Sequence, residues 1–227
     1  MTNLADRGTL ATRLTTLQQA VKRAADGRVQ SGPMPTLIGA SKTQPEPVLR
    51  AALAAGLRHF GENKLQEAEA KWPVLKAAFP EITLHMIGGL QSNKAAAAVA
   101  LFDVIHTVDR AKIAEAIAAE AAKQRRAVQV LIQVNTGEEL QKGGVVPRDA
   151  PALIAHCRAL DMDLVGLMAV PPAEANPAPH FALMKSMADA HGLTWLSMGM
   201  SSDYETAIRL GATHIRVGTA LFGERHA

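Results

Sequence analysis

Residues 128–134, with the sequence VQVLIQV, give the clearest strand signal in the chain and decide its fold class. Short apolar runs of this kind are typical of strands that are buried on both faces of a parallel sheet. A helical segment ends near Gln124 before this run, and another begins at Pro147 after a glycine-rich loop. The run is therefore one strand in a pattern that alternates strands with helices.

The same alternation extends in both directions from this strand. Further strands are predicted at residues 36–40, 58–60, 82–87, 104–107, 164–168, 194–197 and 214–217. Helices are predicted between them at residues 45–55, 63–78, 93–101, 109–124, 147–160, 179–190 and 203–210, and a leading helix at residues 4–25. Asp109 is the expected N-cap of its helix.

These strand–helix units predict a closed barrel. Eight of them within about 200 residues fit an α/β fold of the (β/α)8 TIM-barrel type better than an open sheet. A doubly wound sheet usually has fewer strands, and no Gly-x-Gly-x-x-Gly motif follows the first strand. Because no linker divides the chain, we expect one barrel domain over residues 1–227, with the leading helix, within residues 1–30, packed on it.

The composition narrows the class of protein further. The net charge of +3 is mild and the charges are interspersed, so a nucleic-acid partner is not indicated. No apolar stretch reaches the roughly 18 residues that span a membrane, and the N-terminus lacks a signal-peptide core. We therefore expect a cytoplasmic protein, and a monomer, because no apolar stripe remains once the core is assigned.

The only cysteine, Cys157, makes an intrachain disulfide and a cysteine-based zinc site impossible. Its position inside a predicted helix favours a buried, inert thiol over a nucleophile. We predict no metal site.

Lys42 follows the first predicted strand, where the apolar run gives way to Ser41-Lys42-Thr43. In (β/α)8 barrels the active face lies at the carboxyl ends of the strands. A dry pocket at that place would favour the neutral amine, and a neutral, positioned amine can form an imine with an aldehyde. Taken alone, Lys42 could equally be a solvated surface group.

Small residues follow the last two predicted strands. Gly199, Ser201 and Ser202 precede a predicted helix, and Gly218 and Thr219 follow the final strand. Barrel enzymes often bind a phosphate between these two loops, because backbone N–H groups can approach it and a helix N-terminus adds positive partial charge. Either loop alone could be an ordinary helix cap, but the two together favour a phosphate site.

Arg216 lies at the end of the last predicted strand, where its guanidinium could face the barrel mouth or form a salt bridge on the rim. A lysine, a phosphate site and an arginine at one mouth would suit pyridoxal phosphate. The lysine would form an imine with the aldehyde, and the two loops would bind the phosphate. The arginine would contact the ring nitrogen. The arginine's charge would keep that nitrogen unprotonated, so the ring would be a weaker electron sink.

Several longer motifs, taken in order, resemble one known family. They are residues 41–43 (SKT), 60–63 (FGEN), 85–94 (HMIGGLQSNK), 166–169 (GLMA), 196–201 (LSMGMS) and 216–223 (RVGTALFG). They resemble the pyridoxal phosphate homeostasis proteins, the YggS/PROSC family, and the resemblance covers about residues 36–225. This family is similar to the barrel domain of alanine racemase but lacks that enzyme's second domain.

The resemblance implies both a function and a set of cofactor contacts. Lys42 would carry pyridoxal 5'-phosphate as an internal aldimine, Asn63 would lie beside the ring, Arg216 would face the pyridine nitrogen, Ser201, Gly218 and Thr219 would hold the phosphate, and Met200 would lie close by. The protein would act without catalysis in intracellular vitamin B6 homeostasis, as a carrier that supplies apo-enzymes.

A racemase-like enzyme is the alternative. Two-base racemisation needs an acid/base group on each face of the α-carbon, and in the racemases one of them is a tyrosine from the missing domain. The chain has one tyrosine, Tyr204, in a predicted helix. A barrel that uses Lys42 as an aldolase-type Schiff base without a cofactor is a third reading.

The sequence does not assign a role to three polar residues, Lys64, His85 and Lys142. Lys64 stands where the family often has an aromatic residue, so the ring-side wall is not defined. His85 could point into the barrel or out to a helix. Lys142, in a glycine-rich loop, is either a solvated residue or a transient second contact for the cofactor.

Overall fold

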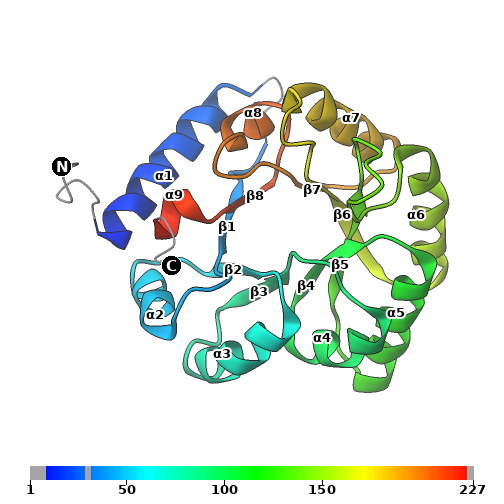
Figure 1. Cartoon of the computed structure of the whole chain (residues 1–227), viewed down its shortest axis with the longest axis horizontal. Coiled ribbons are helices and arrows are strands. Elements are labelled where there is room, and N and C mark those ends of the chain that lie inside the picture. The colour runs from blue at the N-terminus through cyan, green and yellow to red at the C-terminus, as the bar shows by residue number, and fades with distance from the viewer. Residues whose placement is uncertain (1–8, 29–31, 224–227) are drawn as a thin grey trace.

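The computed structural model describes residues 9–28 and 32–223, and it confirms the predicted barrel. Parallel strands β1 to β8 close on one another in chain order, with β8 hydrogen-bonded to β1 (Figure 1). The strands are β1 (Thr36–Ala40), β2 (His59–Glu62), β3 (Thr83–Met86), β4 (Val104–Val108), β5 (Gln129–Val134), β6 (Asp163–Ala169), β7 (Trp195–Ser197) and β8 (His214–Val217).

Helices form the outer ring. They are α1 (Leu10–Asp26), α2 (Glu46–Ala54), α3 (Leu65–Ala78), α4 (Ala95–Leu101), α5 (Ala111–Gln124), α6 (Ala150–Ala159), α7 (Pro177–Ala190), α8 (Tyr204–Arg209) and α9 (Thr219–Phe222), with 3₁₀ turns η1 (Ser92–Lys94) and η2 (Pro147–Asp149). Within the described ranges, none of these helices has the length and apolar character needed to cross a bilayer.

Most helix starts differ from the prediction by one to three residues, and two of the differences have a clear cause. Helix α1 begins at Leu10 because the Thr9 side chain accepts a hydrogen bond from the Thr12 N–H; residues 4–8 of the predicted helix lie outside the described ranges. The N-cap of α5 is Arg110 rather than Asp109. The Asp109 carboxylate is instead paired with the Arg110 guanidinium, so it does not cap the helix.

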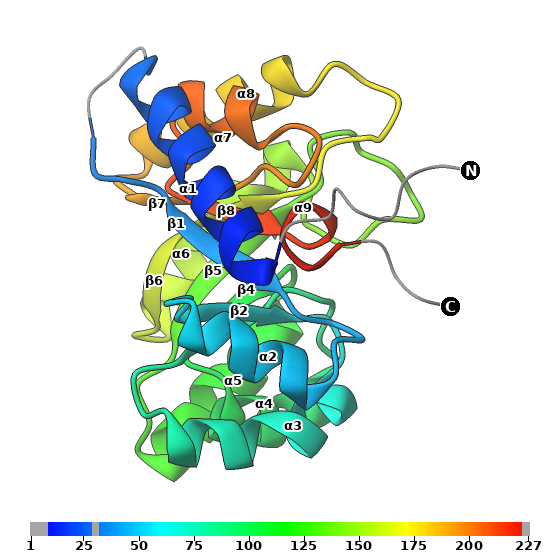
Figure 2. The ribbon, with the colours of Figure 1, turned by 90° about the vertical axis from the view of Figure 1, so that its left-hand side faces the viewer.

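The leading helix fills a gap in the outer ring. The last strand is followed only by α9, a single turn, and α1 packs beside it against α8 (Figures 1 and 2). The Arg13 Nε donates to the Leu221 carbonyl oxygen at 2.8 Å, and the Arg28 Nη2 donates to the Ala212 carbonyl oxygen at 2.9 Å. These bonds fix α1 across the β8 side of the barrel.

The main core lies between the barrel and its helices. Trp72 of α3 packs on Phe60 of β2, with ring centroids 4.9 Å apart. Inside the barrel the apolar cluster is small and is centred on Val104, Leu131 and Met168. Barrel interiors are usually filled by branched aliphatic residues, so much of this interior must be filled by other side chains.

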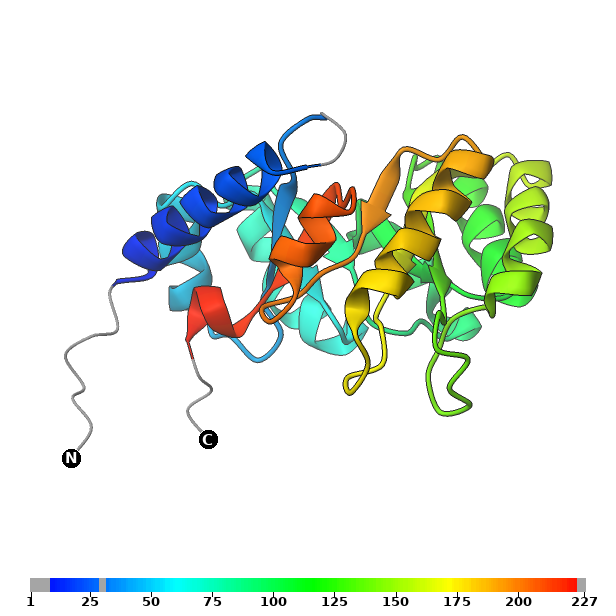
Figure 3. The same cartoon turned by 90° about the horizontal axis from the view of Figure 1, so that it is seen from above.

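The loops after β5 and β6 project at one end of the molecule (Figure 3). The side chain of Asn135 holds the first of these loops through a 2.8 Å hydrogen bond to the Glu139 carbonyl oxygen. This end is the carboxyl end of the strands, where the sequence predicts the site.

Candidate ligand-binding site at the carboxyl end of the barrel

A cavity of about 430 Å³ lies at the carboxyl ends of the strands. All seven residues that the sequence analysis nominated line it: Lys42, Asn63, Met200, Ser201, Arg216, Gly218 and Thr219. Ser202, which the sequence places in the predicted phosphate loop, also lines it, and the lining that was not predicted is Ala40, Gln44, Ile87, Val170 and Gly223. Its volume is that of a typical small-ligand site.

Lys42 lines this cavity with an unengaged amine. The side chain is half-buried, and its Nζ atom makes no hydrogen bond or ion pair with any described residue. The structure therefore leaves the amine available to a ligand.

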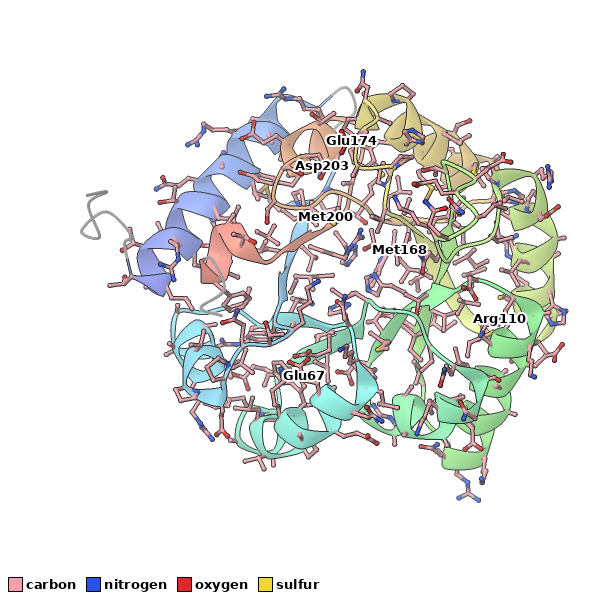
Figure 4. The ribbon with its side chains drawn as sticks, in the orientation of Figure 1. Glu67, Arg110, Met168, Glu174, Met200 and Asp203 are labelled. Carbon is pink, nitrogen blue, oxygen red and sulfur yellow. The ribbon has the colours of Figure 1, made fainter. Side chains whose placement is uncertain are left out.

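The backbone beside Lys42 is held firmly. Thr43 has a φ of 64°, in the left-handed region that a β-branched residue seldom adopts. Its N–H donates to Glu67 Oε1, and Lys71 Nζ donates both to the same carboxylate, at 2.8 Å, and to the Ser41 carbonyl oxygen, at 3.2 Å. Glu67 lies on α3 (Figure 4). The turn that presents Lys42 is thus anchored to a neighbouring helix.

These contacts determine the protonation state of the Glu67 carboxyl group. Burial acts to raise the pKa of its carboxyl group, but the hydrogen bonds from Lys71 and from the Thr43 N–H outweigh that effect and lower the pKa below its usual value. Glu67 therefore stays a carboxylate near neutral pH and keeps its acceptor role beneath the Lys42 turn.

A second carboxylate, Glu62, joins the same network from β2. It is 0% exposed, and its Oε1 accepts from Ser41 Oγ at 2.8 Å, Trp72 Nε1 at 2.9 Å and Lys71 Nζ at 2.8 Å. Glu62 thus links β2, α3 and the residue before Lys42. This role was not predicted from the sequence, although an acidic residue between the apolar Phe60 and the helix was a visible signal.

Arg216 is held through its side chain. It is 5% exposed; its Nη1 donates to the carbonyl oxygen and Oγ of Ser197, both at 2.7 Å, and its Nη2 donates to the Ala169 carbonyl oxygen at 2.9 Å. No described residue forms an ion pair with it, so the rim salt bridge is not formed. Burial lowers the pKa of Arg216 to about 10, against the opposing effect of Asp203. Its positive charge faces the cavity.

The loop after β7 is built to pass close to α8. Gly199 has a φ of 92°, and a Cβ atom there would lie 2.6 Å from the Ala207 Cβ. The Gly199 carbonyl oxygen accepts from the Arg216 N–H at 3.0 Å, and the Met200 N–H donates to Asp203 Oδ1 at 2.6 Å. Figure 4 shows Met200 nearer the barrel axis than Asp203. The loop is therefore tied to the strand that carries Arg216.

The loops after β7 and β8 each lead into a short helix beside the cavity. Ser201 and Ser202 precede α8, and Gly218 is the N-cap of α9. At the start of α8 the Tyr204 N–H already donates to the Met200 carbonyl oxygen, but the N–H groups of Ser201, Ser202 and Thr219 have no acceptor among the described residues. Both loops therefore offer hydrogen-bond donors of the kind that an anionic group needs.

Asn63 completes the wall at the end of β2. A Cβ atom at Gly88 would lie 2.1 Å from the Asn63 carbonyl oxygen, so the loop after β3 passes directly against Asn63. This close approach requires glycine and fixes the Asn63 backbone at the cavity.

Other residues considered from the sequence lie away from this cavity. Met168 is buried within the barrel, because β6 continues to Ala169 (Figure 4). Lys64 is exposed at the start of α3. Lys142 pairs with Glu139 Oε2 at 2.7 Å and donates to the Pro171 carbonyl oxygen.

Tyr204 and Cys157 also lie outside the cavity. Tyr204 begins α8 and packs on the outer core; burial, with Glu205 adding to it, raises its pKa. Cys157 is buried in α6, and burial raises the pKa of its thiol to about 11, so the thiol is inert as expected. Within the described ranges, no three His, Cys, Asp or Glu side chains are arranged to hold a metal ion.

The fold and the cavity together define a class: single-domain (β/α)8 barrels with a lysine after β1 and small Ser, Gly and Thr residues after β7 and β8 at one cavity. The family model described as alanine racemase, N-terminal domain, matches residues 35–226. The chain is 41% identical to the pyridoxal phosphate homeostasis protein of Pseudomonas aeruginosa over 223 residues, which is 96% of each chain. It therefore belongs to the family of pyridoxal phosphate homeostasis proteins.

Solved structures agree with this assignment. PipY of Synechococcus elongatus PCC7942, in the structure without PLP, matches with a TM-score of 0.85 and 37% identity, covering 95% of this chain and 100% of PipY. The structure of PipY with PLP bound matches with a TM-score of 0.80 over the same shares of the two chains. The family resemblance predicted from the sequence motifs is thus confirmed.

Proposed function

We propose that the chain binds pyridoxal 5'-phosphate covalently through Lys42 and acts without catalysis in intracellular vitamin B6 homeostasis, as a carrier that supplies apo-enzymes. The observation that carries this proposal is the single cavity shared by Lys42, Arg216 and the loops after β7 and β8. The names of the relatives and the PLP-bound form of PipY support it.

The lining residues fit the cofactor group by group. When bound, the cofactor supplies an aldehyde, an aromatic ring and a phosphate. Lys42 offers an unengaged amine to the aldehyde, and the loops after β7 and β8 offer the N–H groups of Ser201, Ser202 and Thr219 to the phosphate. Arg216 has no carboxylate partner among the described residues, so it presents its charge to the ligand. Asn63 and Met200 complete the wall.

The same lining argues for a carrier rather than a racemase. Of the described residues that line the cavity, none is a histidine, aspartate, glutamate, cysteine or tyrosine. Racemisation needs a second acid/base group opposite the lysine, and Tyr204 lies on the outer core instead. Arg216 would also keep the ring nitrogen unprotonated and so restrain carbanion chemistry.

Absorbance and mass test the covalent site. The purified full chain with pyridoxal 5'-phosphate should be yellow; after borohydride reduction, intact mass should rise by one reduced cofactor, and peptide mapping should place it on Lys42. Lys42→Ala should remain colourless and unmodified. A colourless wild-type protein, or a label on another lysine, would overturn the proposal.

Two further measurements separate carrier from enzyme. The loaded protein should restore activity to an apo-enzyme that needs pyridoxal 5'-phosphate, whereas α-deuterated amino acids should keep their deuterium in its presence. Exchange at a useful rate would favour the racemase reading.

The proposed carrier is a cytoplasmic monomer, with the cavity mouth open to client enzymes. Light scattering should give a mass of 24.1 kDa, and twice that mass would contradict the proposal.

A further inference from the structure

Three histidines cross the interior of the barrel in one hydrogen-bonded row. His59 Nδ1 lies 3.0 Å from His85 Nε2, and His85 Nδ1 lies 2.9 Å from His106 Nε2. His106 Nδ1 lies 2.9 Å from Ser197 Oγ, which accepts from Arg216 Nη1 at 2.7 Å. We call His59, His85 and His106 the histidine row; it comes from three successive strands, β2, β3 and β4.

The histidine row connects the two ends of the barrel. His59 is half-buried and lines a cavity of about 390 Å³ at the start of β1 and β2. Arg216 lines the cavity of about 430 Å³ at the opposite end. His85 and His106 between them are fully buried. A continuous line of polar contacts therefore runs from one end of the barrel to the Arg216 guanidinium.

The direction of these hydrogen bonds follows from Arg216. A guanidinium only donates, so Ser197 Oγ must accept from it and is free to give its own proton to His106 Nδ1. His106 then carries its proton on Nε2 and donates to His85 Nδ1, and His85 donates from Nε2 to His59 Nδ1. This arrangement satisfies every donor and acceptor between Arg216 and His59.

The reverse direction leaves a group unsatisfied. Ser197 Oγ would then accept from both Arg216 and His106, and its own proton would have no acceptor among the described residues. A buried unsatisfied hydroxyl is costly. The fixed donor character of Arg216 thus selects the Nε2–H tautomer along the whole row.

The row must also be uncharged. Burial lowers the pKa of His85 well below its usual value, with His106, His59 and His214 adding to the effect. Burial likewise lowers the pKa of His106, with Arg216 and His214 adding to it. A proton on either ring would place a charge in a fully buried site, and on His106 it would also face the permanent charge of Arg216.

We propose that Ser197, His106 and His85 are positioning residues that fix the Arg216 guanidinium at the cavity through this one-directional row. The proposal rests on the proposed function, because Arg216 acts there on bound pyridoxal 5'-phosphate. Aliphatic residues would fill a barrel interior without a polar network to satisfy. The polar row in their place ends on the one buried cation that lines the cavity.

Histidine side-chain ¹⁵N NMR of the full chain without cofactor tests the row directly. His85 and His106, assigned by single substitution, should be neutral with the proton on Nε2 from about pH 8 to about pH 5. A proton on Nδ1 of either ring, or titration near the usual pKa, would overturn the proposal. This readout does not depend on cofactor binding, so it stands even where the proposed function fails.

Cofactor dissociation constants test the positioning role. Ser197→Ala and His106→Leu should each weaken binding of pyridoxal 5'-phosphate about 10-fold. The double variant should bind no worse than either single variant, because both substitutions break the same unit. Wild-type binding in the two single variants, or losses that multiply in the double variant, would overturn the positioning role. Ser197→Ala changes one atom and keeps the test usable where His106→Leu does not fold.

His214→Phe is the matched control. His214 is also buried inside the barrel, and its ring centroid lies 6.4 Å from that of His85, but its hydrogen bond goes to Thr213 Oγ1, outside the row, and it stacks on Trp195 with centroids 4.0 Å apart. This variant should bind the cofactor like the wild type, and a 10-fold loss in it would show that any buried histidine has the same effect. Failure of the wild type itself to bind would count against the proposed function alone.

Discussion

Lys42 and Arg216 are the two cations that line the cavity, and the barrel holds them in opposite ways. Arg216 is fixed through its side chain, by three hydrogen bonds to neutral oxygens. Lys42 has a side chain without a partner among the described residues, on a backbone turn that is anchored by Glu67 and Lys71. This difference matches the proposed function, in which Lys42 must react with the cofactor and release it, whereas Arg216 must supply an unchanging charge.

The two groups of residues that support Lys42 and Arg216 also differ in charge. Behind Lys42 lies an ionic network in which Lys71 bridges two carboxylates. Behind Arg216 lies an uncharged row of imidazoles. Removing one partner from the ionic network leaves a buried charge without its counter-ion. Adding a proton to the uncharged row creates a buried charge. The first support should therefore be sensitive to substitution and the second to acid.

The largest effect is expected from Lys42→Arg, which keeps the charge but removes the nucleophilic amine. Covalent attachment of pyridoxal 5'-phosphate should be lost completely, as judged by intact mass after borohydride reduction. The free energy of unfolding should change by less than about 0.5 kcal/mol, because the amine has no partner to lose. A large loss of stability would show that Lys42 is held in its place like Arg216.

Lys71→Met should have the next largest effect. Lys71 is 14% exposed and pairs with Glu62, which is fully buried, so the substitution leaves a buried carboxylate without its cation. A loss of about 3 kcal/mol in urea unfolding is expected, together with slower attachment to Lys42, because the Ser41 carbonyl oxygen loses its donor.

Lys76→Met is the matched control on the same helix. Lys76 pairs with Asp103, which is 30% exposed, so its loss should cost about 1 kcal/mol or less and leave attachment unchanged. Equal losses in the two variants would show that burial of Glu62 has no special weight.

The barrel and the cavity could be predicted from the sequence because both depend only on the order and the ends of the strands. Strands β1 and β8 have the bounds predicted from their apolar runs, and in a closed barrel the ends of all strands converge. Lys42 and Arg216 therefore line one cavity although they are far apart in the chain. Strand order and strand ends are sufficient for that prediction.

The supports behind the two cations could not be predicted in this way. The row depends on register, which places Gly61 beside His85 and His85 beside Val104, and on which face of β3 points inward. The sequence left the direction of His85 open. The role of Glu62 similarly depends on where Trp72 and Lys71 of α3 meet β2. Such contacts between elements are set by packing, as is the loss of Asp109 as a cap.

Acid should destabilise the barrel through the buried histidines near Arg216, of which His214 gives the clearest test. Burial lowers the pKa of His214 to about 3, with His59 and Arg216 adding to the effect. Since the folded value lies below the unfolded value of about 6.5, the unfolded chain binds the extra proton. Stability is therefore present above about pH 6.5 and is lost as the pH falls toward about 3.

His214→Phe removes this contribution, while His59, His85 and His106 remain in both proteins. Between about pH 6 and about pH 4, the free energy of unfolding of the wild type should fall more steeply than that of the variant, by about 1.4 kcal/mol per pH unit. Urea titrations at a series of pH values measure both slopes. Parallel slopes would mean that His214 is already protonated in the folded barrel.

The smallest effect is expected at the turn that presents Lys42. Asparagine tolerates the left-handed φ of 64° better than threonine does, so Thr43→Asn should raise the free energy of unfolding by about 1 kcal/mol or less. Attachment to Lys42 should be unchanged, because Glu67 still accepts the backbone N–H. A destabilised variant would mean that the hydrogen bond from the threonine hydroxyl to the Lys42 carbonyl oxygen outweighs the strain.

Arg125→Asn provides the comparison away from the site. Arg125 ends α5 with a φ of 53°, so it should gain a similar stability without any effect on attachment. If Thr43→Asn also slows attachment while Arg125→Asn does not, the strain itself presents the amine. Unchanged attachment in both variants would assign that role to Glu67 and Lys71, whose bonds hold the turn whichever side chain occupies position 43.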